Sequence, residues 1–375
     1  MTSTQRLPAS LTPLDAALAI LLHDLAPVAP RELWIAEALG CVAAEMPPLQ
    51  AVPPCDVAAV DGWALRARDL VGASSYSPLP LAVAPVWVEA GDAMPEGCDC
   101  VLDASCVDRT GPVAEVLAEA NPGQGVRRAG VDLAEGRSVV ASGRRVGRID
   151  LLNARAAGLE SMRVRHPRLR LVDVPADSGS DHTALLIFEL AGAAGASPAR
   201  VEAGGRDAAS IAHMIDPGDC DLLVTIGGSG VGRTDATIAA LTARGVDVAH
   251  GIALQPGRTA AVGRIGKIPV IALPGAPDQA LAGWWTLVLP VLDRLSGLLP
   301  RQSCNLPLAR KIASSVGLAE IVLLEESAGA WMPLAVGELP LELISRADAW
   351  LVIPGGSEGF AAGTPVNAYL LRDLI

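Results

Sequence analysis

The stretch DLLVTIGGSGVGRTDATIAAL, residues 221–241, joins a buried strand to a helix through a glycine-rich loop. Residues 221–226 are apolar enough for a buried strand, and the Ala, Ile and Leu spacing predicts a helix over 235–244. Thr234 or Asp235 is expected to cap that helix. Backbone N–H groups can approach an anion closely where the loop has glycine, at Gly227, Gly228, Gly230 and Gly232. The stretch therefore predicts a loop that binds phosphate.

The same alternation of strand and helix extends on both sides of this loop. Residues 169–174 and 270–273 read as strands, and residues 181–194 and 278–295 read as helices. Such alternation predicts a parallel sheet covered by helices, with its ligand site at the carboxyl ends of the strands. The turn LPGAP, residues 273–277, is expected at the same edge.

Composition limits the classes of function. The chain has 375 residues, a formal net charge of −12 and a hydrophobic fraction of 51%. The negative charge argues against nucleic acid as a partner. No apolar run reaches the roughly 18 residues of a membrane helix, which predicts no membrane partner. Seven cysteines, an odd number, suggest reduced thiols and a cytoplasmic location.

Two other patterns allow more than one interpretation. The loop also reads as GGSGVGRT, a P-loop with Arg233 in place of the lysine, so an NTPase is an alternative. Cys98, Cys100 and Cys106 form a cluster without a zinc-like spacing, and we expect buried apolar side chains there.

Six ordered stretches resemble one family. VPPCDVAAVDGWALR, AGDAMPEGCDCVL, GQGVRRAGVDLAEG, DLLVTIGGSGVGRTD, LQPGRTAAVG with IALPGAPDQAL, and ADAWLVIPGGSEGFAAGTPVNAYLL occur in this order. They resemble PP-x-D-x-SAMDGYA-x-R, TG-A-x-LPEGADAVV, N-x-RR-x-GED-x-x-x-G, D-x-x-I-x-SGG-x-SVGE-x-D, the KPGKP and LPGNP pair, and the terminal ADGLIVLP motif. These are motifs of the molybdopterin molybdenumtransferase family, the MoeA-like and gephyrin E-domain-like proteins, and the chain resembles a divergent member.

The resemblance implies a multidomain fold of α/β and β parts. It implies a three-layer α/β domain of the molybdopterin-binding type with a mainly parallel sheet over residues 167–300. A small β domain is expected over 54–125 and a β-barrel-like domain over 301–375. An elongated, helix-containing domain for linkage and dimerisation is expected from residues 1–53 and 126–166, since family members are homodimers.

The resemblance also implies the chemistry. The family inserts molybdate into adenylylated molybdopterin, releases AMP and uses a divalent cation, for which Mg²⁺ is expected here. Asp61, Asp132 and Asp235 are then the catalytic residues, and Asp61 and Asp235 the metal ligands. Other cofactor-synthesis proteins or a recipient molybdoenzyme are the expected protein partners. The residues expected to contact the pterin ligand are Gly227, Gly228, Ser229, Gly230, Gly232, Thr234, Arg258, Pro274, Gly275 and Pro277.

Several family residues are replaced in this sequence. No residue aligns with the Glu of the family's T-G-D-E-L motif, for which Asp177 or Asp181 could substitute. The lysines of KPGKP become Gln255 and Arg258, and the Glu of S-V-G-E becomes Arg233. As a transferase, this chain would therefore have an active site that is altered relative to that of the family. A non-catalytic paralogue that binds molybdopterin or finished cofactor, as carrier or assembly partner, is the alternative.

Overall fold

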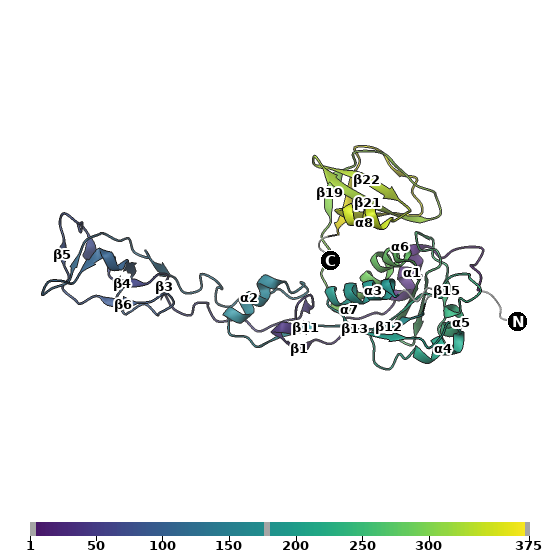
Figure 1. The fold of residues 1–375 in the computed structure, drawn as a ribbon, viewed down its shortest axis with the longest axis horizontal. Coiled ribbons are helices and arrows are strands. Elements are labelled where there is room, and N and C mark those ends of the chain that lie inside the picture. The colour runs from purple at the N-terminus through teal and green to yellow at the C-terminus, as the bar shows by residue number, and fades with distance from the viewer. Residues whose placement is uncertain (1–4, 176–180, 372–375) are drawn as a thin grey trace. The chain divides into compact units, whose positions relative to one another are not determined.

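The computed structural model describes residues 5–175 and 181–371 and divides into two compact units (Figure 1). Unit 1 consists of Met1–Ala44, Ser142–Gly147 and Ser161–Ile375. Unit 2 consists of Glu45–Ala141 and Arg148–Glu160. The finer division into four domains stays a prediction.

A six-stranded sheet forms the centre of unit 1. In spatial order, the first four strands run parallel to one another. The fifth strand is antiparallel to the fourth, and the sixth is antiparallel to the fifth. The order is β13 (Ser197–Glu202), β12 (Arg168–Asp173), β14 (Leu222–Ile226), β18 (Ile268–Leu273), β17 (Ala261–Ile265) and β15 (Ala249–His250). The predicted mainly parallel sheet is confirmed, although β13 and the helix after it were not among the predicted elements.

Helices cover both faces of this sheet, as Figure 1 shows. Every residue of β14 is buried, as expected for a central parallel strand. Leu222 and Val224 pack into one hydrophobic cluster, and Leu223 packs into the cluster on the opposite face. The first cluster includes α1 (Leu14–Leu22), α3 (His182–Ala193), α6 (Pro277–Gly283) and α7 (Leu289–Ser296), and the second includes α4 (Ala208–Met214) and α5 (Thr237–Ala243). The three-layer architecture is therefore confirmed.

The helix predicted over 278–295 is interrupted. A π-helical stretch, η4 (Trp284–Val288), separates α6 from α7. Pro290 lies in the first turn of α7 and has no N–H to donate to the preceding turn, which accounts for the wider turn there. No helix within the described residues is long enough and apolar enough to cross a membrane.

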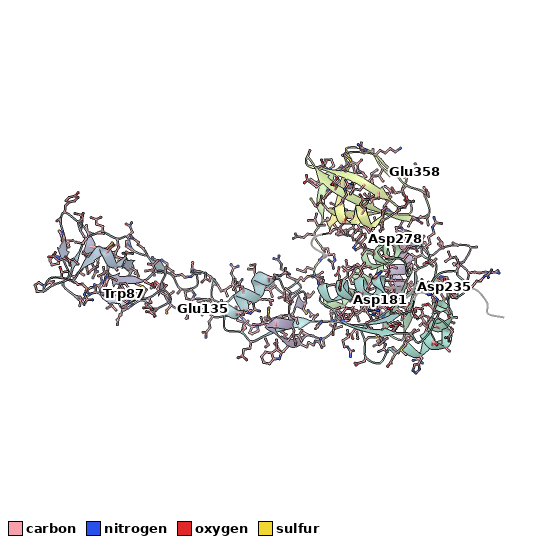
Figure 2. All side chains as sticks on the ribbon, viewed as in Figure 1. Trp87, Glu135, Asp181, Asp235, Asp278 and Glu358 are labelled. Carbon is pink, nitrogen blue, oxygen red and sulfur yellow. The ribbon has the colours of Figure 1, made fainter. Side chains whose placement is uncertain are left out.

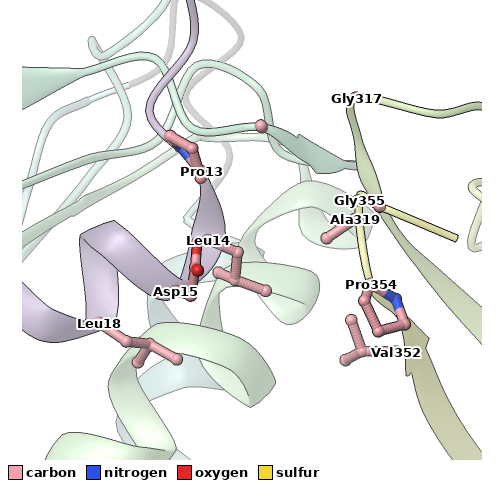
Figure 3. Close-up of a pocket in the computed structure, with 11 residues that line it drawn as sticks. Pro13, Leu14, Asp15, Leu18, Gly317, Ala319, Val352, Pro354 and Gly355 are labelled. Atoms are coloured by element: carbon pink, nitrogen blue, oxygen red, sulfur yellow. The ribbon is translucent and has the colours of Figure 1, made fainter.

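A second sheet of unit 1 is formed mainly by the C-terminal residues. The short strand β16, which follows β15 in the sequence, belongs to this second sheet and pairs in parallel with β21, with Leu254 opposite Ala319. A mostly apolar pocket of about 550 Å³ lies between the start of α1 and this sheet, with Leu14, Leu18 and Val352 in its lining (Figure 3). The strands of this sheet are β16 (Leu254–Gln255), β19 (Cys304–Pro307), β21 (Ala319–Ser327), β22 (Ala330–Val336), β23 (Ala349–Ile353) and β25 (Pro365–Leu370). β20 (Ile312–Ala313) and β24 (Gly359–Phe360) pair with each other in a separate two-stranded sheet, and α8 (Leu341–Arg346) precedes β23.

A small antiparallel sheet completes unit 1. Its strand order is β1 (Arg31–Trp34), β11 (Ser161–Arg165) and β2 (Val42–Ala43). Met162 and Val164 of the central strand are buried, so β11 contributes apolar side chains to the interior.

Unit 2 consists of short antiparallel strands, one α-helix and two short 3-10 helices, η2 (Ala67–Leu70) and η3 (Ala104–Cys106). Leu65, Leu70, Cys100 and Val116 are buried together in its main core. Burial raises the pKa of the Cys100 thiol to about 11, which agrees with the predicted apolar role, whereas Cys98 and Cys106 are half-buried. The elements are β3 (Val57–Ala58), β4 (Gly62–Leu65), β5 (Leu79–Pro80), β6 (Val86–Val88), β7 (Cys100–Leu102), β8 (Val107–Asp108), β9 (Glu115–Val116), β10 (Val126–Arg127) and α2 (Arg148–Ala156).

Candidate functional site

A pocket of about 290 Å³ lies where the parallel strands β12, β14 and β18 end. We call it the loop pocket. Of the predicted site residues, six line it together: Gly227, Gly228, Gly230, Asp235, Pro274 and Gly275. The rest of its lining is Asp173, Val174, Asp181, Thr183, Ala184, Arg206, Ile226, Thr259, Ala276 and Gln279. The pocket therefore occupies the edge at which parallel sheets bind ligands.

Other predicted ligand residues of unit 1 lie outside this lining. Ser229 is fully buried, and its Oγ has no hydrogen-bond partner among the described residues. Gly232 and Thr234 are exposed, and the exposed Arg258 donates from Nε to Gln255 at 2.9 Å. Pro277 starts α6 and lines a neighbouring pocket instead.

Glycine is required at the start of the loop. Gly227 and Gly228 have φ of 88° and 66°, a region that side chains rarely adopt. A Cβ on Gly228 would lie 2.5 Å from Thr237 Oγ1. That hydroxyl donates to the Gly227 carbonyl at 2.8 Å, and the Thr237 N–H donates to the Gly228 carbonyl at 3.0 Å. The two glycines thus let the loop pack directly against the first turn of α5.

Asp235 stabilises the loop rather than capping the helix. The predicted cap at Thr234 or Asp235 is wrong, because α5 begins at Thr237 and its N-cap is Ala236. Asp235 Oδ2 instead accepts the Gly232 N–H at 2.8 Å. The carboxylate is therefore used within its own loop and is not available to the helix N–H groups.

Gln5 is a loop contact that sequence reasoning missed. Its Nε2 donates to the carbonyls of Gly228 at 3.0 Å and Gly230 at 2.8 Å. Its Oε1 accepts the Ile238 N–H of α5 at 2.8 Å. One side chain therefore joins both ends of the loop, and no local sequence signal relates a residue 223 positions away to it.

Acidic residues and arginines are paired in and around the loop pocket. Arg200 Nη2 donates to Asp173 and to Asp181, each at 2.7 Å. Burial raises the pKa of Asp173, and the hydrogen bond from Arg200 opposes that shift, whereas Arg200 lowers the pKa of the exposed Asp181. Arg206 pairs with Asp235 at 3.1 Å. Figure 2 labels Asp181 and Asp235 on this part of the chain.

The LPGAP turn contacts both the loop and α3. Gly275 is close to the loop, since a Cβ built on it would lie 3.5 Å from the Gly227 Cα. The Gly275 carbonyl accepts a hydrogen bond from Thr183 Oγ1 at 2.7 Å. The Gly227 N–H donates to the Leu273 carbonyl at 3.0 Å. These contacts join the turn to the loop, about fifty residues earlier, as expected for adjacent parallel strands, and to α3, 92 positions before Gly275.

The remaining predicted acidic residues belong to unit 2. Asp61 Oδ1 accepts the Ala90 N–H at 2.8 Å. Asp132 pairs with Arg127, whose Nε donates to its Oδ2 at 3.0 Å. Within residues 5–175 and 181–371, no group of three or more His, Cys, Asp or Glu side chains is arranged to hold a metal ion. Asp177, one candidate for the missing Glu, lies outside the described residues, and Asp181 is paired with Arg200.

Two family models match this chain. The MoeA N-terminal region (domain I and II) matches residues 12–158, and the "Probable molybdopterin binding domain" matches residues 170–294. Molybdopterin molybdenumtransferase 2 of Mycobacterium tuberculosis is 29% identical, with 85% of this chain and 89% of that protein aligned. Molybdopterin molybdenumtransferase of Haemophilus influenzae is 28% identical, over 76% and 78% of the two chains.

A solved structure is similar to this chain over nearly its whole length. The molybdopterin biosynthesis MoeA protein of Pyrococcus horikoshii superimposes with a TM-score of 0.70 and 26% identity. That match covers 96% of this chain and 99% of the other. Together with the two matched regions, it shows that this chain belongs to the MoeA-like, molybdopterin molybdenumtransferase family.

Proposed function

We propose that this chain acts in molybdenum cofactor biosynthesis and inserts molybdate into adenylylated molybdopterin with release of AMP. The observation that supports this most is the loop pocket, whose lining residues all lie in or close to a region similar to a probable molybdopterin binding domain. Relatives named molybdopterin molybdenumtransferase over most of the chain support the reaction class.

The glycine loop suits a phosphate group of the ligand. Among the described residues, the N–H groups of Gly228 and Gly230 donate to no protein acceptor, so both are available to phosphate oxygens. Arg206 adds a positive charge to the lining, and an arginine can form paired hydrogen bonds with a phosphate. These groups would bind and orient the ligand, and orientation is a major part of catalysis in phosphoryl chemistry.

The acidic side chains fit a magnesium ion in part. Mg²⁺ is usually held by one or two carboxylates together with substrate phosphates and water, where it neutralises phosphate charge. Asp235 is the ligand that we propose in the loop pocket, and Asp61, which belongs to unit 2, was expected as a second ligand only by resemblance. Asp235 already accepts hydrogen bonds from Arg206 and from the Gly232 N–H, so an ion there would have to compete with the arginine.

A second candidate is a carrier that binds the pterin without turnover. Asp181 and Asp235 are each paired with an arginine, and such pairing removes negative charge that a metal ion would need. We also propose a homodimer, and a cytoplasmic location, which is supported by seven free cysteines.

The reaction can be tested directly. Purified protein is incubated with adenylylated molybdopterin, molybdate and Mg²⁺, and AMP release is measured together with activation of a cofactor-free molybdoenzyme. We expect Asp235→Asn to lower the rate of AMP release by about 100-fold, because positioning and charge supply most of the catalysis. Asp247→Asn, an exposed acid of the same unit, is the control and should leave the rate unchanged.

Three other outcomes would reject the insertase. Tight pterin binding without AMP or enzyme activation would establish the carrier. Absence of pterin binding would reject both candidates. ATP hydrolysis without AMP release from the pterin would favour the NTPase indicated by GGSGVGRT.

A further inference from the structure

Unit 1 has another pocket, of about 540 Å³, that the proposed function does not use. We call it the arginine pocket. Residues 143–145, 298–302 and 369–370 form it, and Arg144, Arg145 and Arg301 are in its lining. No Asp or Glu of the described residues lines it, although the chain has a net charge of −12. A cluster of guanidinium groups in so acidic a chain indicates a local preference for anions.

Hydrogen bonds fix the segment that contains two of these arginines. The Leu299 N–H donates to the Gly143 carbonyl at 2.8 Å, and the Ala43 N–H donates to the Arg144 carbonyl at 2.9 Å. Arg145 Nη1 donates to the carbonyls of Gly40, at 2.8 Å, and Ala194. The backbone that places the cations is therefore ordered before any ligand binds, which lowers the entropic cost of binding.

The three arginines carry more positive charge than the neighbouring carboxylate neutralises. Arg301 donates from Nε and Nη2 to the two carboxylate oxygens of Asp293, each at 2.6 Å. Arg145 Nη2 is 3.8 Å from the same carboxylate. Arg144 is exposed and has no ion-pair partner among the described residues. The carboxylate of Asp293 thus contacts two of the three guanidinium groups. The excess of positive charge matches a phosphate monoester, which has a charge of about −1.5 to −2 at neutral pH.

An aromatic surface adjoins these cations. A neighbouring pocket of about 490 Å³ shares Pro300, Arg301 and Tyr369 with the arginine pocket. Trp350 lies between two other rings, with its centroid 5.1 Å from Trp285 at an interplanar angle of 13° and 5.2 Å from Tyr369. Only 3% of this chain is aromatic, so three neighbouring rings beside the arginines are a local concentration. Such a surface favours a ligand with a ring of its own.

The geometry points to a second ligand site here, for a small aromatic phosphate. Its phosphate oxygens bind Arg144 and Arg145, and its ring packs against Tyr369 and Pro300. The site is independent of the proposed insertase reaction, since none of these four residues lines the loop pocket.

Isothermal titration calorimetry of the full chain with phenyl phosphate tests the site. We expect saturable binding that weakens about tenfold or more in Arg144→Gln, because each charged hydrogen bond to a phosphate contributes about one power of ten in affinity. Arg310→Gln, an exposed arginine elsewhere in unit 1, is the matched control and should bind as the wild type does. Tyr369→Leu should weaken phenyl phosphate but not inorganic phosphate.

Each contrary result overturns a stated part of the proposal. If phenyl phosphate does not bind, or if Arg144→Gln and Arg310→Gln bind it equally, the site does not exist. If binding is lost in Gly228→Ala and kept in Arg144→Gln, the ligand occupies the loop pocket. If inorganic phosphate binds as tightly as phenyl phosphate, the aromatic part is wrong. Because Arg144 is exposed, its variant is expected to fold, and a thermal melt verifies this.

Discussion

The loop pocket and the arginine pocket belong to the same unit, yet their charges differ in sign. Asp173, Asp181 and Asp235 line the loop pocket together with Arg206. The arginine pocket has three arginines and no carboxylate of the described residues in its lining. The arginine pocket therefore attracts a free anion more strongly than the loop pocket, where arginines pair with all three carboxylates. A phosphate that arrives with a metal ion, by contrast, needs both the glycine N–H groups and the carboxylates of the first. A glycine loop alone therefore does not define an anion site.

The largest expected effect comes from breaking the loop pocket. In Gly228→Ala the new Cβ would meet Thr237 Oγ1 at 2.5 Å, at a φ of 66°. We expect the free energy of unfolding to fall by about 2–4 kcal/mol, from backbone strain and the forced shift of α5, and AMP release to be lost. Denaturant unfolding and the AMP assay measure the two effects.

Gly245→Ala separates the effect of backbone strain from the effect of the contact between the loop and α5. Gly245 also has a positive φ, of 82°, but a Cβ there would meet nothing within 4 Å. Gly245→Ala should lower the free energy of unfolding by only about 1 kcal/mol and leave AMP release intact. Equal losses in the two variants would show that the contact between the loop and α5 has no special importance.

A smaller effect is expected where Gln5 joins the loop. Gln5→Ala removes hydrogen bonds to Gly228, Gly230 and Ile238. The loss should lower the free energy of unfolding by about 1–3 kcal/mol and weaken pterin binding several-fold, without changing phenyl phosphate binding. Gln50→Ala, at an exposed position of unit 2, is the control. Faster hydrogen exchange at the Ile238 N–H would locate the effect, and unchanged exchange there would contradict it.

The smallest expected effect concerns pH and the helix next to Arg206. Asp207 caps α4, accepting the N–H groups of Ala209 at 3.1 Å and Ser210 at 3.0 Å. Hydrogen bonds from Ser210 lower the pKa of Asp207 below 3.8. Its stabilising contribution is therefore complete above the unfolded value and is lost as pH falls through the lower folded value.

Asp207→Asn removes that titration while keeping a good cap. The stability of the wild type relative to this variant should decline below about pH 4 and stay constant above about pH 5. Unfolding measured at several pH values checks the trend. A pH-independent difference would mean that the Asp207 carboxylate is not stabilised in the folded chain.

The sequence predicted the parts of the site that lie within motifs. The strand before Gly227, the helix after the loop and the LPGAP turn are all local patterns, and each lies near its predicted position. The helix cap was predicted wrongly because Asp235 makes its hydrogen bonds within the loop, a choice that propensity alone does not reveal. Arg206 was missed because it follows a strand, β13, that was not predicted.

Contacts between distant segments could not be predicted. Gln5 reaches a loop 223 positions away, and the arginine pocket joins residues 143–145 to 298–302 and 369–370. No periodicity or spacing relates such segments, because their proximity depends on how strands and helices pack in three dimensions. Asp61 and Asp132 were selected only by resemblance, and their roles stay predictions.

One binding experiment tests the contrast between the two pockets most directly. Molybdopterin and phenyl phosphate are each titrated into the wild type, Gly228→Ala and Arg144→Gln. We expect Gly228→Ala to lose molybdopterin and keep phenyl phosphate, whereas Arg144→Gln should keep molybdopterin and lose phenyl phosphate. If molybdopterin binds Gly228→Ala as tightly as the wild type, the loop pocket is not the pterin site, and the central claim is contradicted.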